Sequence, residues 1–348
     1  MDPMSVSRFS FLKKAIPFLG LFLLWCGLPA GAQHFVLASE VILPNGQPTP
    51  DFHGISGIEY VPAQGMWVLV GDRHRVFTFD GSKINRPEDF GIPANLLERS
   101  VTTGFFESIR VDAQNDAYFF SVEPETTTSV HFSFGRVEPS KARTLLKIPQ
   151  PFPNKGVEGI ALTPTGELWV APEAGWEGET GKTAERIATT RDTVHFFRYK
   201  KPLASDPDAD LAEVGRFAYP IDRYAFVRAS PTHGARYEGD GRGGIAEILA
   251  MGNDTLLVLE RCYLKNRTVT ASLYLATVDE SARRLVKQNE ALFDFRTLNT
   301  VCNVEGMTWG PVQKNGKRTL WIIADDWAGT VPQTSPTLRN QIIVLHER

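Results

Sequence analysis

Hydrophobic residues occur in short runs separated by turn residues, and the clearest unit spans residues 154–173. One apolar run opens with the tripeptide VEG, a PTG turn follows, and a second apolar run ends at Glu173. Two such runs around a Pro/Gly turn predict a β-hairpin. Antiparallel pairing would place Glu158, which opens the first strand, and Glu173 at the same end of the hairpin.

This hairpin pattern recurs along the chain. The other copies are GISGIEYVPAQGMWVLVGDR, FESIRVDAQNDAYFFSVE, GIAEILAMGNDTLLVLER and VEGMTWGPVQKNGKRTLWIIADD. The first three opening positions, Ser56, Glu107 and Glu158, are separated by equal steps of fifty-one residues. A third strand follows each copy, and the runs RTLLKIP, EVGRFAYP and LVKQNEALFDF supply fourth strands to copies two, three and four. Four short strands per repeat predict the blades of a β-propeller.

We therefore expect an all-β fold, a single β-propeller over residues 33–348. Five blades are countable, and a degenerate sixth is allowed for around residues 85–99 or 222–241. No outer strand remains after the last copy, so the N-terminal run HFVLASEVILP is expected to supply it and close the ring.

Residues 1–32 have the features of a signal peptide. Basic residues precede an apolar stretch at residues 15–28, and the small residues AGA end at position 32. An uncleaved membrane anchor is the alternative, but the apolar run is short for a spanning helix. We expect a periplasmic or secreted protein that is not embedded in the membrane after cleavage.

Composition narrows the function classes. The 348-residue chain is 42% hydrophobic and carries a net charge of −3, which argues against nucleic acid or a membrane surface as partner. The mature chain keeps Cys262 and Cys302, which form either a disulfide or two buried thiols. The oligomeric state is left open.

Acidic residues at equivalent hairpin positions predict two rings of carboxylates at one end of the propeller channel. The opening ring comprises Glu107, Glu158 and Glu305, and the closing ring comprises Asp72, Glu123, Glu173, Glu260 and Asp325. Converging hard oxygen ligands suit Ca²⁺. The alternative is structural, with the carboxylates accepting hydrogen bonds that hold neighbouring blades together. The fourth copy has Ile245 and Ala246 where the others place an opening acid.

Two arginines directly follow closing acids. Arg73 and Arg261 are candidate catalytic residues that would bind a phosphate or carboxylate group, or else form salt bridges to a neighbouring blade. No Gly-x-Ser-x-Gly motif is present around Ser56. His53 and His74 flank the acidic end of the first blade, where either would act as an acid/base or simply pack.

The motifs GISGIEY with GDR, NKGVEGIAL with PE, LLVLER, and NVEGMTWG with ADD resemble those of the exported phytase-like domain family, "esterase-like activity of phytase". The resemblance covers the chain from about Phe52 to His346. It implies a β-propeller and a hydrolase of small phosphate or other esters. It assigns no catalytic residue.

A carboxylester hydrolase is a third and weaker interpretation, because the sequence shows no Ser/His pair, and two functions are favoured over it. In the first, the acid rings hold Ca²⁺, which polarises a phosphoryl oxygen and activates water, while the arginines stabilise developing charge. In the second, the protein is a non-catalytic ligand-binding or scaffold propeller of the cell envelope, because the same fold hosts many functions.

Overall fold

The repeated hairpins form four-stranded antiparallel sheets, as the sequence predicts. The computed structural model describes residues 34–44, 52–71, 75–91, 95–99, 105–123, 127–134, 143–149, 156–174, 192–200, 211–221, 239–264, 269–327 and 337–348. Residues 33–348 make one compact unit. The signal peptide predicted for residues 1–32 lies outside the described residues.

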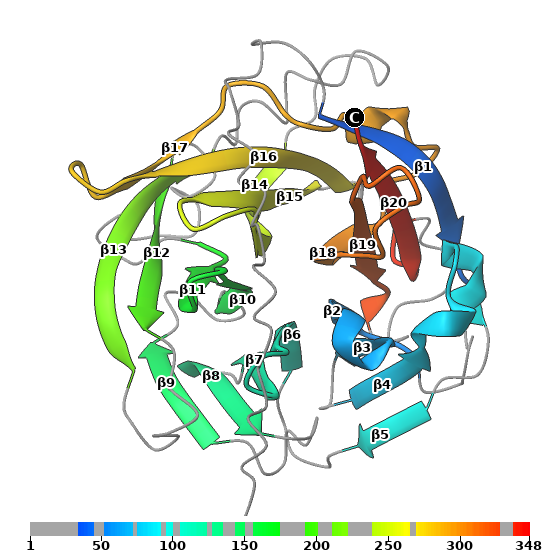
Figure 1. The fold of residues 1–348 in the computed structure, drawn as a ribbon. Coiled ribbons are helices and arrows are strands. Elements are labelled where there is room, and N and C mark those ends of the chain that lie inside the picture. Colours follow the sequence, from blue (N-terminus) through cyan, green and yellow to red (C-terminus); the bar gives the residue numbers. More distant parts are fainter. Residues whose placement is uncertain are drawn as a thin grey trace, which may run out of the picture. The chain divides into compact units, whose positions relative to one another are not determined.

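The described strands build five blades around a central axis (Figure 1). The first blade contains β2 (Ile55–Val61), β3 (Met66–Gly71), β4 (Arg75–Asp80) and β5 (Asn95–Arg99). The second contains β6 (Phe105–Asp112), β7 (Ala117–Glu123), β8 (Thr127–Phe134) and β9 (Arg143–Pro149). The third contains β10 (Val157–Leu162), β11 (Glu167–Pro172), β12 (Asp192–Lys200) and β13 (Ala212–Ile221).

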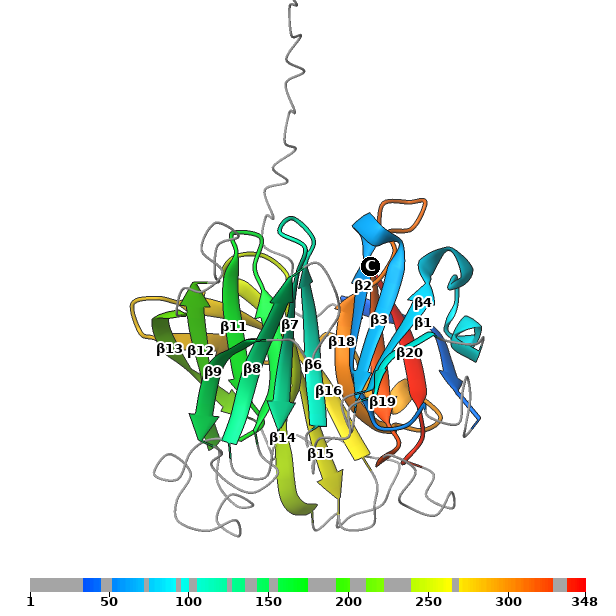
Figure 2. The same ribbon diagram turned by 90° about the horizontal axis from the view of Figure 1, so that it is seen from below.

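The fourth blade contains β14 (Gly239–Ala250), β15 (Thr255–Leu264), β16 (Val269–Asp279) and β17 (Arg284–Lys287). The fifth contains β18 (Asn303–Trp309), β19 (Thr319–Asp325), β20 (Gln341–Glu347) and β1 (Phe35–Ile42). The innermost strands, β2, β6, β10, β14 and β18, contact one another around the axis. Seen from below, the strands of each blade run along this axis (Figure 2).

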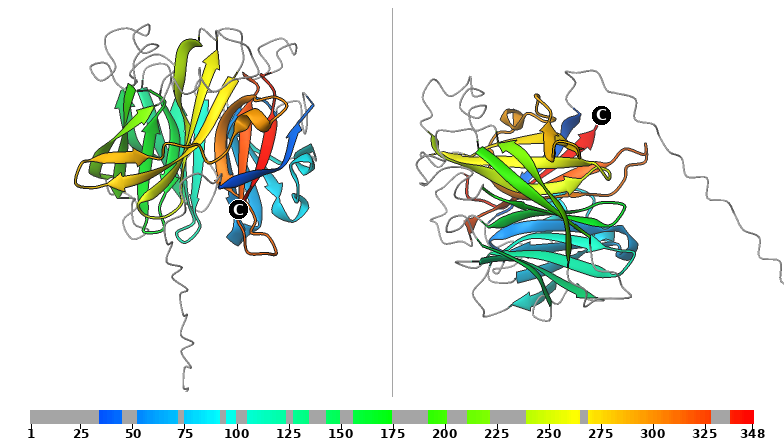
Figure 3. Two further views of the ribbon diagram at one scale, coloured as in Figure 1. Left: turned by 90° about the horizontal axis from the view of Figure 1, so that it is seen from above. Right: turned by 90° about the vertical axis from the view of Figure 1, so that its left-hand side faces the viewer.

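The N-terminal strand closes the ring as predicted. β1 pairs antiparallel with β20, from Phe35 opposite Glu347 to Ile42 opposite Gln341, and the two strands lie side by side in Figure 3. Because the two ends of the chain share one sheet, the fifth blade joins the beginning of the propeller to its end.

The described residues contain no sixth blade. Residues 85–99 instead supply a short 3-10 helix, η3 (Pro87–Gly91), and the outer strand β5 of the first blade. Residues 239–241 begin β14, and residues 222–238 lie outside the described part of the chain. The other described helices are also 3-10 turns: η1 (Pro62–Gln64), η2 (Gly81–Lys83) and η5 (Phe295–Thr297). None of the described helices is long and apolar enough to cross a membrane.

The hydrophobic core consists of layers between neighbouring blades. Each of the apolar clusters among the described residues joins two adjacent sheets. Between the fifth and first blades, for example, the rings of Trp67 and Trp321 lie 4.7 Å apart and both pack against Phe90. The third and fourth blades are joined further, because β13 pairs with β17 at Ala218 and Arg284. These layers hold the innermost strands in place around the axis.

Candidate acidic site

A β-bulge interrupts every innermost strand at the same point of its pairing with the second strand. A bulge inserts an unpaired residue and redirects its side chain. The bulged residues are Ser56, Glu107, Glu158, Ala246 and Glu305. The opening position predicted from the repeats is therefore the bulge, and Ala246 occupies it in the fourth blade as the sequence indicates.

The prediction that Glu260 occupies the closing position of the fourth blade is wrong, because the strand register assigns that position to Arg261. In the third blade, Pro172 pairs with Val157 just before the bulge, and Glu173 follows. In the fourth blade, Glu260 pairs with the residue just before the bulge, so the position equivalent to Glu173 belongs to Arg261. The same rule selects Glu123 in the second blade and Asp325 in the fifth. Asp72 and Arg73 lie outside the described residues.

Glu260 consequently belongs to a different environment. Successive side chains point to opposite faces of a strand, and the fully buried Glu260 contacts residues of the blade interface. It accepts a hydrogen bond from the Tyr219 hydroxyl at 2.6 Å and from Lys287 Nζ at 2.5 Å. Lys287 is itself 8% exposed and lies 3.8 Å from the centre of the Tyr274 ring. This buried ion pair lies within the fourth blade, and the hydrogen bond from Tyr219 on β13 joins it to the third blade.

Arg261 lies among the ring acids. Its Nη1 donates to Asn303 Oδ1 at 2.8 Å and to Glu305, and its Nη2 donates to Glu173 Oε1 at 3.4 Å. Asn303 in turn donates from Nδ2 to Glu305 Oε1 at 2.8 Å and to Asp325 Oδ2 at 3.4 Å. One guanidinium thus links acids of the third and fifth blades from its place on the fourth.

The ring acids that the structure describes are buried at this end of the propeller: Glu107, Glu123, Glu158, Glu173, Glu305 and Asp325. We call these residues, with Arg261 and Asn303, the acidic cluster. Glu123 accepts a hydrogen bond from the backbone N–H of Gly156 at the entry to the third blade.

The electrostatics of the cluster favour a protonated Glu158. Burial raises the pKa of Glu158 well above its ordinary value of 4.5, and the neighbouring carboxylates raise it further, Glu107 most and then Glu173. Burial alone would lower the pKa of Arg261, but the carboxylates of Glu305, Glu173 and Glu158 outweigh burial and raise it. Arg261 therefore stays charged, whereas Glu158 tends to keep its proton.

The described acids do not fit a calcium site. No three or more His, Cys, Asp or Glu side chains converge to hold a metal ion in the part of the chain that the structure describes. A calcium ion takes six to eight oxygen ligands, whereas the oxygens of Glu173 and Glu305 face the guanidinium of Arg261. Calcium binding at this end of the propeller stays a prediction.

A histidine–aspartate pair lies next to the acidic cluster. His53 Nδ1 is 2.6 Å from Oδ2 of Asp326, the residue after Asp325. Asp326 also accepts hydrogen bonds from the Gly54 backbone N–H at 2.8 Å and from Asn340 Nδ2 at 3.3 Å. The His53 side chain is 19% exposed and that of Asp326 is 4% exposed. The sequence places His53 at this end but does not indicate its partner.

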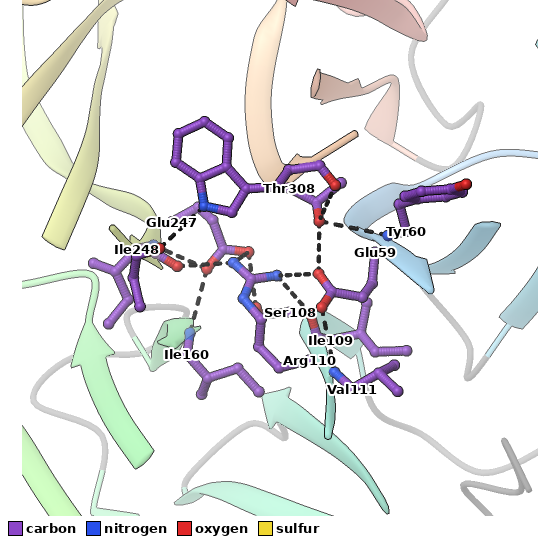
Figure 4. Close-up of polar contacts among 12 residues, drawn as sticks. Glu59, Tyr60, Ser108, Ile109, Arg110, Val111, Ile160, Glu247, Ile248 and Thr308 are labelled. Atoms are coloured by element: carbon purple, nitrogen blue, oxygen red, sulfur yellow. Dashed lines mark hydrogen bonds and ion pairs between the residues drawn. The ribbon is translucent and has the colours of Figure 1, made fainter. Parts of the chain in front are cut away.

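A second buried polar network crosses the axis (Figure 4). Arg110 Nη2 lies 3.0 Å from Glu247 Oε2, and Arg110 Nη1 lies 3.5 Å from Glu59 Oε2. Ser108 Oγ donates to Glu247 Oε2 at 2.8 Å, and Thr308 Oγ1 donates to Glu59 Oε2 at 2.7 Å. We call these five residues the axial network. They come from β2, β6, β14 and β18.

The third blade also contributes to the axial network, because the Ile160 backbone N–H donates to Glu247 Oε1 at 3.3 Å. Burial raises the pKa of Glu247 from 4.5 to about 8, although Arg110 and two hydrogen bonds oppose that shift. Burial likewise raises the pKa of Glu59 despite the nearby Arg110. All the innermost strands thus meet in this network.

The innermost strands also touch directly. A side-chain carbon at Gly57 would lie 3.1 Å from the backbone of Ser108 and Ile109, and one at Gly159 would lie 2.8 Å from the backbone nitrogen of Ile248. A side-chain carbon at Gly306 would lie 2.5 Å from the Ser56 carbonyl oxygen. Each of these glycines directly follows a bulged position. Backbone contacts and the axial network therefore fill the axis next to the acidic cluster.

The prediction for the two cysteines also has a structural outcome. Cys262 and Cys302 are buried thiols that are not joined in a disulfide, so the alternative of two buried thiols is confirmed. Burial raises the pKa of Cys302 to about 12, which keeps its thiol protonated. A separate surface hollow lies where β13 meets β17, away from the acidic cluster. It is lined by Thr193, Ala218, Pro220, Arg284, Leu285, Val286 and Lys287.

The fold and the cluster define a five-bladed β-propeller with buried acids at one end of its axis. The family model described as "Phytase-like: Esterase-like activity of phytase" matches residues 50–326. The chain belongs to this family. Among curated proteins, none matches the chain.

Solved structures with similar folds share little sequence with this chain. The catalytic domain of a GH62 α-L-arabinofuranosidase from Coprinopsis cinerea has 9% identity and a TM-score of 0.48, covering 90% of this chain and 97% of its own. An engineered GH43 glycoside hydrolase has 11% identity and a TM-score of 0.46. The alignment covers 89% of this chain and 52% of the GH43 chain, so this chain spans about half of that protein.

Proposed function

We propose that this protein is an exported hydrolase of small phosphate or other esters, and that its reaction takes place at the acidic cluster. Membership of a family described by esterase-like activity supports the reaction class. The observation that carries the location is the raised pKa of Glu158, a buried acid surrounded by other acids. Perturbed carboxyl groups of this kind concentrate at functional sites.

Glu158 has the properties of a general acid. A carboxyl group whose pKa is raised keeps its proton at a higher pH than an ordinary glutamate, and can donate it to the leaving oxygen of an ester. The bulge at Glu158 separates it from the regular strand pairing. Arg261 is positioned by Asn303 and Glu305, and its permanent positive charge lies beside the carboxyl groups of Glu173 and Glu305. The cluster thus combines a proton-holding acid with a fixed cation.

The charges of the acidic cluster indicate which kind of ester it can bind. The cluster holds several buried carboxylates and one guanidinium, so a polyanion such as phytate meets repulsion unless a further cation accompanies it. An ester with little charge meets no such barrier. We therefore expect hydrolysis of an uncharged aryl ester to be faster than release of phosphate from phytate.

The competing proposal is a non-catalytic propeller, and one observation favours it. Arg261 links Glu173 of the third blade with Glu305 of the fifth, which is what a purely structural brace would do. If this proposal holds, Glu158→Gln changes the melting temperature while no substrate is turned over by either protein.

The deciding experiment measures turnover of an aryl acetate, an aryl phosphate and phytate by the purified protein and by Glu158→Gln. The exposed Glu290 provides a matched control, Glu290→Gln. Turnover by wild type and the control, with its loss in Glu158→Gln, supports the proposal. Equal turnover in all three proteins excludes Glu158 as the general acid.

A further inference from the structure

We infer that His53, oriented by Asp326, is the residue that accepts the proton from the attacking water. This inference rests on the proposed hydrolase function and adds a catalytic residue to it. The side chains of His53 and Asp326 come from opposite ends of the sequence, and the closed ring brings Nδ1 and Oδ2 within 2.6 Å.

The hydrogen bonds around Asp326 determine the orientation of the imidazole. Its carboxylate accepts from the Gly54 backbone N–H and from Asn340 Nδ2, both of which can only donate. An ionised carboxylate is an acceptor only, so His53 donates to it from Nδ1. The lone pair of the neutral ring then lies on Nε2, which is the nitrogen that can take a proton.

Both the ring and its partner are held firmly. The Asp326 side chain is 4% exposed, and Asn340 Nδ2 also donates to the Phe52 carbonyl at 3.1 Å. Arg75 Nη1 donates to the carbonyl of His53 itself at 3.1 Å. The His53 side chain keeps 19% of its surface exposed, so water and a small substrate can reach it. A buried orienting acid with a partly exposed imidazole is the arrangement that general-base catalysis needs.

The pair borders the acidic cluster through consecutive residues. Asp326 follows Asp325, whose Oδ2 accepts from Asn303, and Asn303 accepts from Arg261. On the other strand, His53 lies three residues before Ser56, the bulged residue of the first blade. Both connections lead to the end of the axis where Glu158 lies.

Hydrolysis of the ester needs one proton acceptor and one proton donor. The oxygen of a water molecule forms a bond to the carbonyl carbon or phosphorus of the ester, and its proton moves to Nε2 of His53. The bond from that carbon or phosphorus to the leaving oxygen breaks, and Glu158 supplies the proton that this oxygen needs. His53 then returns its proton to solvent and Glu158 regains one, which restores the starting state.

The test compares wild type with His53→Ala, His53→Asn and His346→Ala, assayed on the aryl ester with and without added imidazole. His53→Asn keeps an N–H donor near Asp326 but cannot accept the proton. His346, which contacts Gln313 in the fifth blade, is the control histidine. Melting temperatures show whether each variant is folded.

We expect kcat to fall by about 10²–10⁴-fold in both His53 variants, with imidazole restoring turnover in His53→Ala alone. We expect His346→Ala to match wild type. Wild-type turnover in His53→Asn, or a folded His53→Ala that imidazole does not rescue, would overturn the role of His53 while leaving the proposed function intact. Absence of turnover by wild type on every substrate would overturn both.

Discussion

Nη2 of Arg110 lies 3.0 Å from Oε2 of Glu247, and this ion pair joins the innermost strands of the second and fourth blades. Both side chains are almost completely buried, at 2% and 0% exposure. Arg110 also faces Glu59 of the first blade and donates from Nη2 to the Ile248 carbonyl at 2.7 Å. A single cation therefore lies beside two acids at the axis, the fully buried Glu247 and the partly buried Glu59.

Replacing this cation should strongly destabilise the propeller. Above pH 8, where Glu247 is ionised, Arg110→Met leaves Glu59 and Glu247 without their countercharge, and breaking a buried ion pair typically costs about 3–5 kcal/mol. We expect a loss of that order in the free energy of unfolding, measured by urea denaturation. The control is Arg296→Met, which breaks an ion pair with Asp294 whose side chains are 50% and 27% exposed. Its expected loss is about 0–1 kcal/mol, and equal losses in the two variants would contradict the role of the axial network.

The axial network also predicts a pH dependence of stability. The pKa of Glu247 is about 8 in the folded protein, above its ordinary value of 4.5, so the folded state holds a proton that the unfolded chain releases. The free energy of unfolding should therefore fall as pH rises from 4.5 to 8. Glu247→Gln removes this contribution and should flatten the slope in that window. Urea denaturation at a series of pH values tests this, and an unchanged slope in Glu247→Gln would contradict it.

Glu260 and Glu158 should respond differently to the same change. Glu260→Gln weakens the buried pair with Lys287, so we expect a lower melting temperature and unchanged kcat/KM for the folded enzyme. Glu158→Gln removes a proton donor but replaces a protonated carboxyl group with a neutral amide of similar shape, so we expect lost turnover without lower stability. Calorimetry and ester kinetics on both variants test this contrast. The reverse pattern would return Glu260 to the catalytic cluster.

Chelation tests the calcium prediction. Glu173 and Glu305 face Arg261, and the described acids do not converge on an ion, so we expect turnover of an uncharged ester to persist with chelator. The measurement is the rate of ester hydrolysis with chelator, and then after calcium is added back. Loss of activity on chelation that calcium reverses would mean that residues outside the described ranges, such as Asp72, complete a metal site.

The repeats alone predict most of the fold and part of the site. Equal spacing of Ser56, Glu107 and Glu158 indicates the blades, and each of these residues occupies a bulge. The closing position in the fourth blade was harder to predict, because Glu260 and Arg261 are consecutive and a shift of one residue reverses the face of a strand. Only the pairing of Glu260 with Ile245 shows that Arg261, and not Glu260, occupies the closing position of the fourth blade.

The axial network could not be predicted from single repeats. Glu59, Arg110 and Glu247 each read as a polar residue within an alternating strand, and only the closed ring shows that they point at one another (Figure 4). The contact between His53 and Asp326 likewise forms only when the ring closes, since the two residues are 273 positions apart in the sequence. Contacts across blades depend on ring closure, which local sequence does not encode.

The most direct test of the account is the pH-controlled rate of aryl ester hydrolysis by wild type, Glu158→Gln and the exposed control Glu290→Gln, each verified as folded. We predict turnover by wild type and the control and a loss of about 10²–10⁴-fold in kcat for Glu158→Gln. Wild-type hydrolysis that Glu158→Gln fully retains would contradict catalysis by Glu158. No turnover of any ester by the folded wild-type protein would contradict the hydrolase itself.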